Sequence, residues 1–208
     1  GFEGYEEIPQ AITLGYTTMA AESIKQLQLQ GIKRPTHVFL QAGVGSMAGG
    51  VLGYLADYFG EDLPQTTIME ADDAACIFES VKSGTMIAIG GHPETIMAGL
   101  NCGEANVCTY PVLKDFASWF AACPDWVTEQ GMCQLAHPEP GDQAIISGES
   151  GAVGLGLLMS LCENGEYGEF KEKMGLDENS IILLFSTEGD TDPENYQRII
   201  NREKNNDE

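Results

Sequence analysis

Apolar residues recur along the chain with two different spacings. A helical spacing runs through the first thirty residues, on a stripe formed by Ile8, Ile12, Met19, Ile24 and Leu27. Pro9 falls in the first turn of this predicted helix, where proline is tolerated, and Gly31 ends it. Pro35 prevents the helix from resuming, so a new element is expected directly after it.

Beyond Pro35, short apolar runs alternate with helix-spaced segments. The runs predict strands at residues 36–41, 66–70, 85–89 and 180–186. The helical spacing predicts helices at residues 47–59, 72–81, 110–121, 126–135 and 153–161, with loop and helix mixed over residues 94–106. This alternation indicates the α/β class, with a parallel sheet covered by helices on both faces.

The predicted organisation is one unit over residues 1–200, followed by a polar tail at residues 201–208. Ligands of open parallel sheets bind at the carboxyl ends of the strands. Glycine-rich or polar turns follow strands or open helices at residues 42–50, 148–152 and 186–190. We therefore expect the site among these three turns.

Composition narrows the range of partners. The 208 residues are 43% hydrophobic and 20% charged, which is typical of a globular protein. Ten basic against 32 acidic residues give a net charge of −22. This excludes nucleic-acid binding through a basic patch and argues against anionic membrane surfaces. The longest apolar run, residues 151–162, is too short to span a bilayer, and no secretory signal pattern opens the chain.

The six cysteines form no CxxC pair, and no Cys/His cluster has zinc spacing, so no metal site is predicted. We interpret them as reduced thiols of a cytoplasmic protein. A local disulfide, for example between Cys76 and Cys102, is the alternative.

The glycine-rich turn at residues 42–50 is suited to binding an anion such as phosphate. Glycines allow close backbone approach, and the amides of a loop that enters a helix bind phosphate well. The spacing Gly43-x-Gly45-x-x-Ala48, with Glu70 ending the next predicted strand, also fits a dinucleotide fingerprint. On this pattern alone, a nicotinamide or flavin site and a plain phosphate site both remain open.

Four segments together resemble one family. They are residues 41–50 (QAGVGSMAGG), 95–104 (TIMAGLNCGE), 147–156 (SGESGAVGLG) and 186–192 (STEGDTD). In this order they resemble the diaminopropionate ammonia-lyases, pyridoxal-phosphate enzymes of fold type II, the tryptophan synthase β fold. The opening residues 3–9 (EGYEEIP) are similar to the middle of that family's chain. The resemblance implies the C-terminal half of such an enzyme.

The resemblance also implies a reaction and a set of binding residues. The family converts 2,3-diaminopropionate to pyruvate and ammonia with pyridoxal 5'-phosphate, which acts as the electron sink. The residues that match its phosphate cradle are Gly43, Val44, Gly45, Ser46, Met47 and Ala48. Ser186, or Thr187 beside it, matches the hydroxyl that faces the pyridine nitrogen, and Glu149 and Ser150 match a turn that lines the ring. A helix cap at Ser150 and a solvated carboxylate at Glu149 are the structural alternatives.

One departure from the family is decisive. Pyridoxal chemistry needs a lysine imine, and none of the seven lysines lies in the family's Phe-Lys segment, which precedes this chain in the family order. No catalytic residue is therefore assigned in this chain. We expect it to need the N-terminal half as a partner, and the resemblance implies a homodimer. Another serine or threonine dehydratase of the same fold, or a non-catalytic binding module, is the alternative function.

Overall fold

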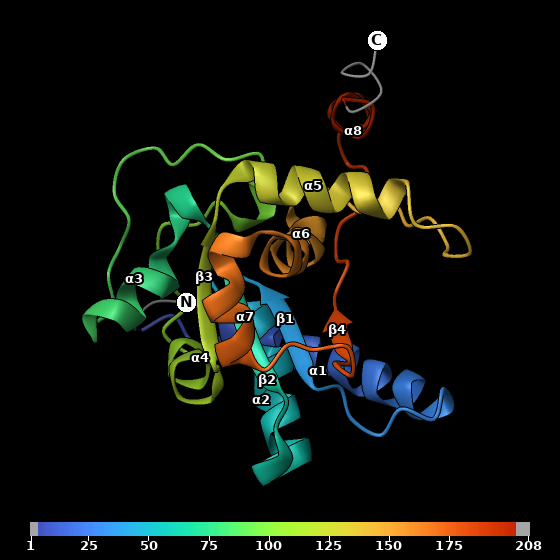
Figure 1. Ribbon diagram of the computed structural model, residues 1–208. Coiled ribbons are helices and arrows are strands. Elements are labelled where there is room, and N and C mark those ends of the chain that lie inside the picture. Colours follow the sequence, from blue (N-terminus) through green and yellow to red (C-terminus); the bar gives the residue numbers. More distant parts are fainter. Residues whose placement is uncertain (1–3, 203–208) are drawn as a thin grey trace.

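The computed structural model describes residues 4–202, and within that range one four-stranded sheet is surrounded by helices (Figure 1). The strands are β1 (His37–Gln41), β2 (Gln65–Ala71), β3 (Trp119–Cys123) and β4 (Ile182–Leu184). The first helices are α1 (Glu7–Leu29), α2 (Ser46–Phe59), α3 (Cys76–Ser83) and α4 (Tyr110–Phe116). The later helices are α5 (Asp125–Ala136), α6 (Glu149–Glu163), α7 (Gly168–Met174) and α8 (Pro193–Ile200).

The strand order places a ligand-binding position beside β1. The order is β3-β2-β1-β4, and every neighbouring pair is parallel. The chain moves from β1 to β2 and β3 on one side and then returns to place β4 on the other side. Between β1 and β4 the direction of winding therefore reverses, and such a switch point leaves a crevice at the carboxyl ends of the strands.

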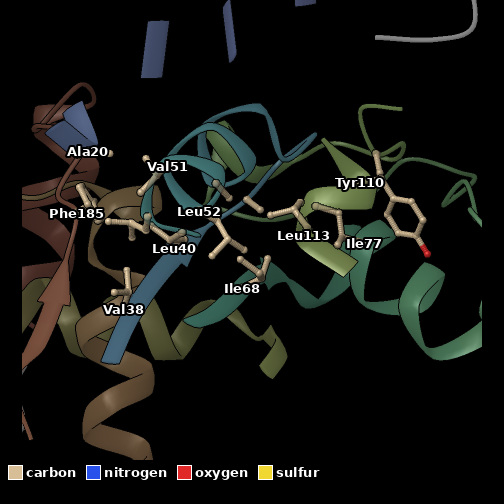
Figure 2. Close-up of a cluster of buried hydrophobic side chains, with 14 of the residues drawn as sticks. Ala20, Val38, Leu40, Val51, Leu52, Ile68, Ile77, Tyr110, Leu113 and Phe185 are labelled. Carbon is tan, nitrogen blue, oxygen red and sulfur yellow. The ribbon is translucent and has the colours of Figure 1, made fainter. Parts of the chain in front are cut away.

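The two central strands, β1 and β2, are buried on both faces, which explains why each carries consecutive apolar residues at its centre. Val38, Leu40 and Ile68 face a core shared with α1, α2 and α4, part of which Figure 2 shows. Phe39 and Met69 point the opposite way, into a second core shared with α5, α6 and α7. The prediction of an α/β fold with a parallel sheet and helices on both faces is confirmed.

The prediction of a strand at residues 85–89 was wrong. Residues 85–89 form no strand, and the position beside β2 is occupied by residues 119–123, which lay partly in a predicted helix over residues 110–121. That helix ends at Phe116, and Ser118 N donates to Thr66 O at 2.9 Å as the chain joins the sheet. Trp119 and Phe120 thus pack as strand residues, because pairing with β2 overrides the local helical spacing.

The other predicted elements differ less from the observed ones, mainly at their boundaries. The predicted helix at residues 153–161 begins at Glu149, so the predicted turn at residues 148–152 is mostly helical. Residues 72–74 form a short 3-10 turn ahead of α3. Of the predicted apolar stripe on the first helix, Ile8 and Ile12 are each about half exposed, whereas Ile24 is buried. Helix α8 was not predicted, and residues 203–208 of the predicted tail lie outside the described residues.

Two further expectations concern membranes and thiols. Within residues 4–202 no helix combines the length and the hydrophobicity that a bilayer crossing requires.

All six cysteines, Cys76 and Cys102 included, are free thiols in the structure. Burial raises the pKa of Cys76 and of Cys123 to about 12, so both thiols stay neutral at physiological pH.

Candidate functional site

A cavity of about 470 Å³ opens at the switch point between β1 and β4. It brings together segments that are far apart in the sequence: the turn after β1, the 3-10 turn at residues 98–100, the first turn of α6 and the turn after β4. Its lining residues are Tyr16, Gln41, Gly43, Met47, Gly99, Leu100, Ser150, Thr187, Glu188, Gly189 and Thr191. All three predicted turns therefore contribute to one site.

The turn after β1 is built to leave backbone amides free for an anion. Gly45 has φ +87°, a conformation that favours glycine, and it precedes the first residue of α2. Gly49 N donates to Gly45 O at 2.8 Å, which is the first bond of the helix. The amides of Ser46, Met47 and Ala48 therefore have no acceptor within α2, and the helix dipole adds positive potential there.

Asn106 holds this loop in shape from outside. Its backbone N donates to Val44 O at 2.7 Å, and its side-chain amide donates to Ser46 Oγ at 2.9 Å. Asn106 Oδ1 in turn accepts from Cys108 N at 3.0 Å, and the residue is almost fully buried. These hydrogen bonds restrain the loop, and a restrained loop loses less entropy when a ligand binds.

The residues present fit the phosphate of pyridoxal 5'-phosphate. A Cβ on Gly43 would lie 2.8 Å from Gly99 O and 2.9 Å from Cys102 Sγ, so only glycine allows the loop to close this tightly. Among the six predicted cradle residues, Gly43 and Met47 line the cavity. Val44, Gly45, Ser46 and Ala48 lie in the same loop and first helical turn, where backbone amides are the donors.

The predicted hydroxyls after β4 have different positions. Thr187 lines the cavity, and its Oγ1 accepts from Gln41 Nε2 at 2.9 Å, while the same Gln41 nitrogen donates to Phe185 O at 2.7 Å. Ser186 is exposed, and its hydroxyl donates to Ser147 Oγ at 2.8 Å. Gln41 therefore joins the carboxyl ends of β1 and β4 beneath the cavity.

The two predicted residues at the start of α6, Glu149 and Ser150, point in different directions. Ser150 lines the cavity, and its Oγ accepts from Gly99 N at 3.1 Å. Glu149 is buried, and its carboxylate accepts a hydrogen bond from the Asn195 side chain of α8, away from the cavity lining. Gly148, rather than Ser150, is the N-cap of α6, and Glu149 is not a solvated carboxylate.

Several lining residues were not singled out by the sequence analysis. Gln41, Gly99, Leu100, Glu188 and Thr191 all fall inside the four family-like segments, which is the signal that could have found them. Tyr16 comes from α1 and lies in no motif, so its position depends on how α1 packs against α2. No lysine of the described residues lines the cavity, so none of them is placed to form an imine there.

Glu70 does not serve the dinucleotide role that its spacing allowed. It is buried in β2, where its carboxylate accepts from Ile77 N at 2.8 Å and from Phe78 N at 2.7 Å, both on α3. Both oxygens are thereby directed at α3, and Glu70 is absent from the lining of the cavity. Burial raises its pKa to about 7, although these two hydrogen bonds act in the opposite direction.

The raised pKa of Glu70 predicts a pH-dependent stability. Between the ordinary pKa of 4.5 and about 7, folded Glu70 keeps its proton while unfolded Glu70 releases it. The folded state then binds more protons, so the free energy of unfolding falls as pH rises, by about 3 kcal/mol across this window. Urea unfolding at about pH 4.5 and pH 7.5 should show this contribution in the native protein and its loss in Glu70→Gln.

Exposed Asp73, three residues away, offers a matched control. Asp73→Asn should leave the change between the two pH values as it is in the native protein. An equal change in native protein and Glu70→Gln would show that Glu70 titrates alike in the folded and unfolded states.

Comparison with known proteins agrees with this geometry. The family described as pyridoxal-phosphate dependent enzyme matches residues 4–174. The diaminopropionate ammonia-lyase of Escherichia coli strain K12 is 45% identical over 199 residues, which cover 96% of this chain and 50% of that protein. The corresponding enzyme of Salmonella typhimurium strain LT2 is 43% identical over 200 residues, covering 95% and 50%.

A solved structure shows the same likeness in three dimensions. The crystal structure of the Escherichia coli diaminopropionate ammonia lyase in complex with D-serine matches with a TM-score of 0.90 and 43% identity. The match covers 96% of this chain and 50% of that one. The chain thus spans about half the length of the relatives that it matches.

Proposed function

The chain belongs to the family of pyridoxal-phosphate-dependent enzymes, and from this premise we propose that it is part of an ammonia-lyase acting on 2,3-diaminopropionate. The products are pyruvate and ammonia, formed by α,β-elimination. The observation that carries the proposal is the 45% identity to a diaminopropionate ammonia-lyase across 96% of this chain. Within that enzyme the chain forms the C-terminal portion of the large cofactor-binding domain.

The residues of this chain hold and orient the cofactor, which supplies an electron sink when bound. Amides of residues 43–48 bind its phosphate, at the N-terminus of α2. Ser150 and Thr187 form part of the wall around the ring. A hydroxyl from Thr187 or Ser186 is a poor acid, so it leaves a ring nitrogen that it faces largely neutral, which favours β-elimination. Glu149 supports α6 through Asn195.

We assign the imine-forming lysine to the N-terminal half of the enzyme, which either a longer parent chain or a separate polypeptide supplies. None of the described lysines lines the cavity, and the chain spans half the length of its relatives. The chain alone is therefore inactive, and its partners are the N-terminal half and the amino-acid substrate. We place the assembled enzyme in the cytoplasm as a homodimer.

Borohydride trapping tests the proposal. The purified chain is incubated with pyridoxal 5'-phosphate, reduced and analysed by intact and peptide mass spectrometry. We expect no stoichiometric adduct on any lysine, and pyruvate from diaminopropionate only after addition of the N-terminal half of the Escherichia coli relative. A single modified lysine in this chain, or turnover by the chain alone above that of free pyridoxal phosphate, would overturn it.

Substrate choice is measured in the same assay. Turnover of serine or threonine in preference to diaminopropionate would identify a dehydratase of this fold instead. Binding of NAD without binding of pyridoxal 5'-phosphate would identify a nucleotide-binding protein.

A further inference from the structure

Four residues from separate segments form a continuous line of contacts along the cavity wall. Gly43 follows β1, Gly99 lies in the 3-10 turn at residues 98–100, Ser150 is in the first turn of α6, and Glu188 follows β4. A Cβ on Gly43 would lie 2.8 Å from Gly99 O, so these two backbones are in contact. Gly99 N donates to Ser150 Oγ at 3.1 Å, and Ser150 N donates to Glu188 Oε2 at 2.6 Å.

Glu188 is the anchor at the end of this line. The N-cap of α6 is Gly148, which has no side chain to accept from the free amides of the first turn. The Glu188 carboxylate, from a segment nearly forty residues away, supplies that acceptor for Ser150 N. Glu188 O also accepts from Gly148 N at 3.0 Å.

Close packing leaves this anchor little freedom. A Cβ on Gly148 would lie 2.9 Å from Glu188 Cγ, and one on Gly151 would lie 3.3 Å from Glu188 N. The second carboxylate oxygen, Oε1, accepts from Thr191 Oγ1 at 3.4 Å. Glu188 is half-buried, and it is the one carboxylate among the described residues that line the cavity.

We propose that Glu188 is a positioning residue of the cofactor cavity, an inference that rests on the proposed function. Its carboxylate ties the turn after β4 to α6 and holds Ser150. Ser150 in turn holds Gly99 against the phosphate-binding loop at Gly43. The wall is therefore assembled before the cofactor arrives, and binding does not have to order three separate loops. The acceptor oxygen, rather than the negative charge, is the property that this role requires.

Three variants of the full 208-residue chain test the inference. Glu188→Ala removes the acceptor, Glu188→Gln keeps an amide oxygen for Ser150 N, and Asp190→Asn removes an exposed charge from the same turn. The dissociation constant for pyridoxal 5'-phosphate is measured by equilibrium dialysis. Amide hydrogen exchange is measured at residues 97–101 and 148–152. Urea unfolding confirms that each variant is folded under the binding conditions.

We expect Glu188→Ala to weaken cofactor binding about tenfold and to speed exchange in both segments. Glu188→Gln should stay within about twofold of the native protein in both measurements, as should Asp190→Asn. If the alanine variant does not fold, Glu188→Asp, whose shorter side chain withdraws the carboxylate from Ser150 N, takes its place with the same direction of effect.

Two results would overturn the inference. One is native affinity and native exchange in folded Glu188→Ala. The other is a glutamine variant as weak as the alanine variant, because charge would then matter rather than the acceptor. If pyridoxal 5'-phosphate binds neither to the native chain nor to the native chain mixed with the N-terminal half of the Escherichia coli relative, the proposed function fails. The exchange rates still decide whether Glu188 holds the wall.

Discussion

Replacing Gly156 with alanine is expected to lower the free energy of unfolding by about 3 kcal/mol or more. Helices α5 and α6 pack there with their backbones in contact. A Cβ on Gly156 would lie 2.7 Å from the carbonyl carbon of Val127, and one on Gly131 would lie 2.8 Å from Gly156 N. Neither obstacle is the flexible end of a side chain, so the two helices would have to move apart.

Urea unfolding followed by circular dichroism measures this loss. Gly15→Ala is the matched control, because Gly15 lies in helix α1 and its added methyl would meet no neighbouring segment within 4 Å. That variant should gain about 1 kcal/mol from helix propensity alone. A Gly156→Ala variant as stable as the native chain would show that α5 and α6 can separate at little cost.

Gly43→Ala is expected to weaken binding of pyridoxal 5'-phosphate roughly a hundredfold, the equivalent of two charge-assisted hydrogen bonds. The added methyl would meet Gly99 O at 2.8 Å and Cys102 Sγ at 2.9 Å. The backbone oxygen cannot turn aside as a side chain can, so the loop must shift. Amides that are aimed at one phosphate position would then miss it. Equilibrium dialysis of the folded variant measures the effect.

Gly53→Ala provides the control for this substitution. Gly53 lies in α2, the same helix that the phosphate-binding loop enters, and its Cβ would make an ordinary contact of 3.6 Å with Val112 Cγ1. Its affinity for the cofactor should match that of the native chain. Affinity within about twofold of native for Gly43→Ala would mean that the loop does not bind the phosphate.

Much of the fold could be predicted because its signals are local. Strands β1 and β2 are buried on both faces and carry consecutive apolar residues, and α2 follows a glycine, Gly45, with φ +87°. The prediction of β3 was wrong for a reason that no local pattern contains. Residues 85–89 and 119–123 are both short apolar runs, and pairing with β2 decides which one joins the sheet.

The candidate site likewise contains some residues whose positions could be predicted from local sequence and others whose positions could not. The candidate phosphate cradle at residues 43–48 could be predicted because its chemistry depends on consecutive backbone amides and on glycines that allow close backbone approach. Glu149 and Ser150 are neighbours in the sequence, yet one faces α8 and the other faces the cavity, since successive helical side chains point about 100° apart.

The local order of residues thus specifies the glycine-rich loop after β1 and the buried strands. Tertiary structure alone decides that Glu188 holds the start of α6, that Gln41 joins the ends of β1 and β4, and that Tyr16 reaches the cavity. The physical reason is distance along the chain. A backbone turn is specified by its own few residues, whereas each of these contacts joins segments that meet only after the sheet has assembled.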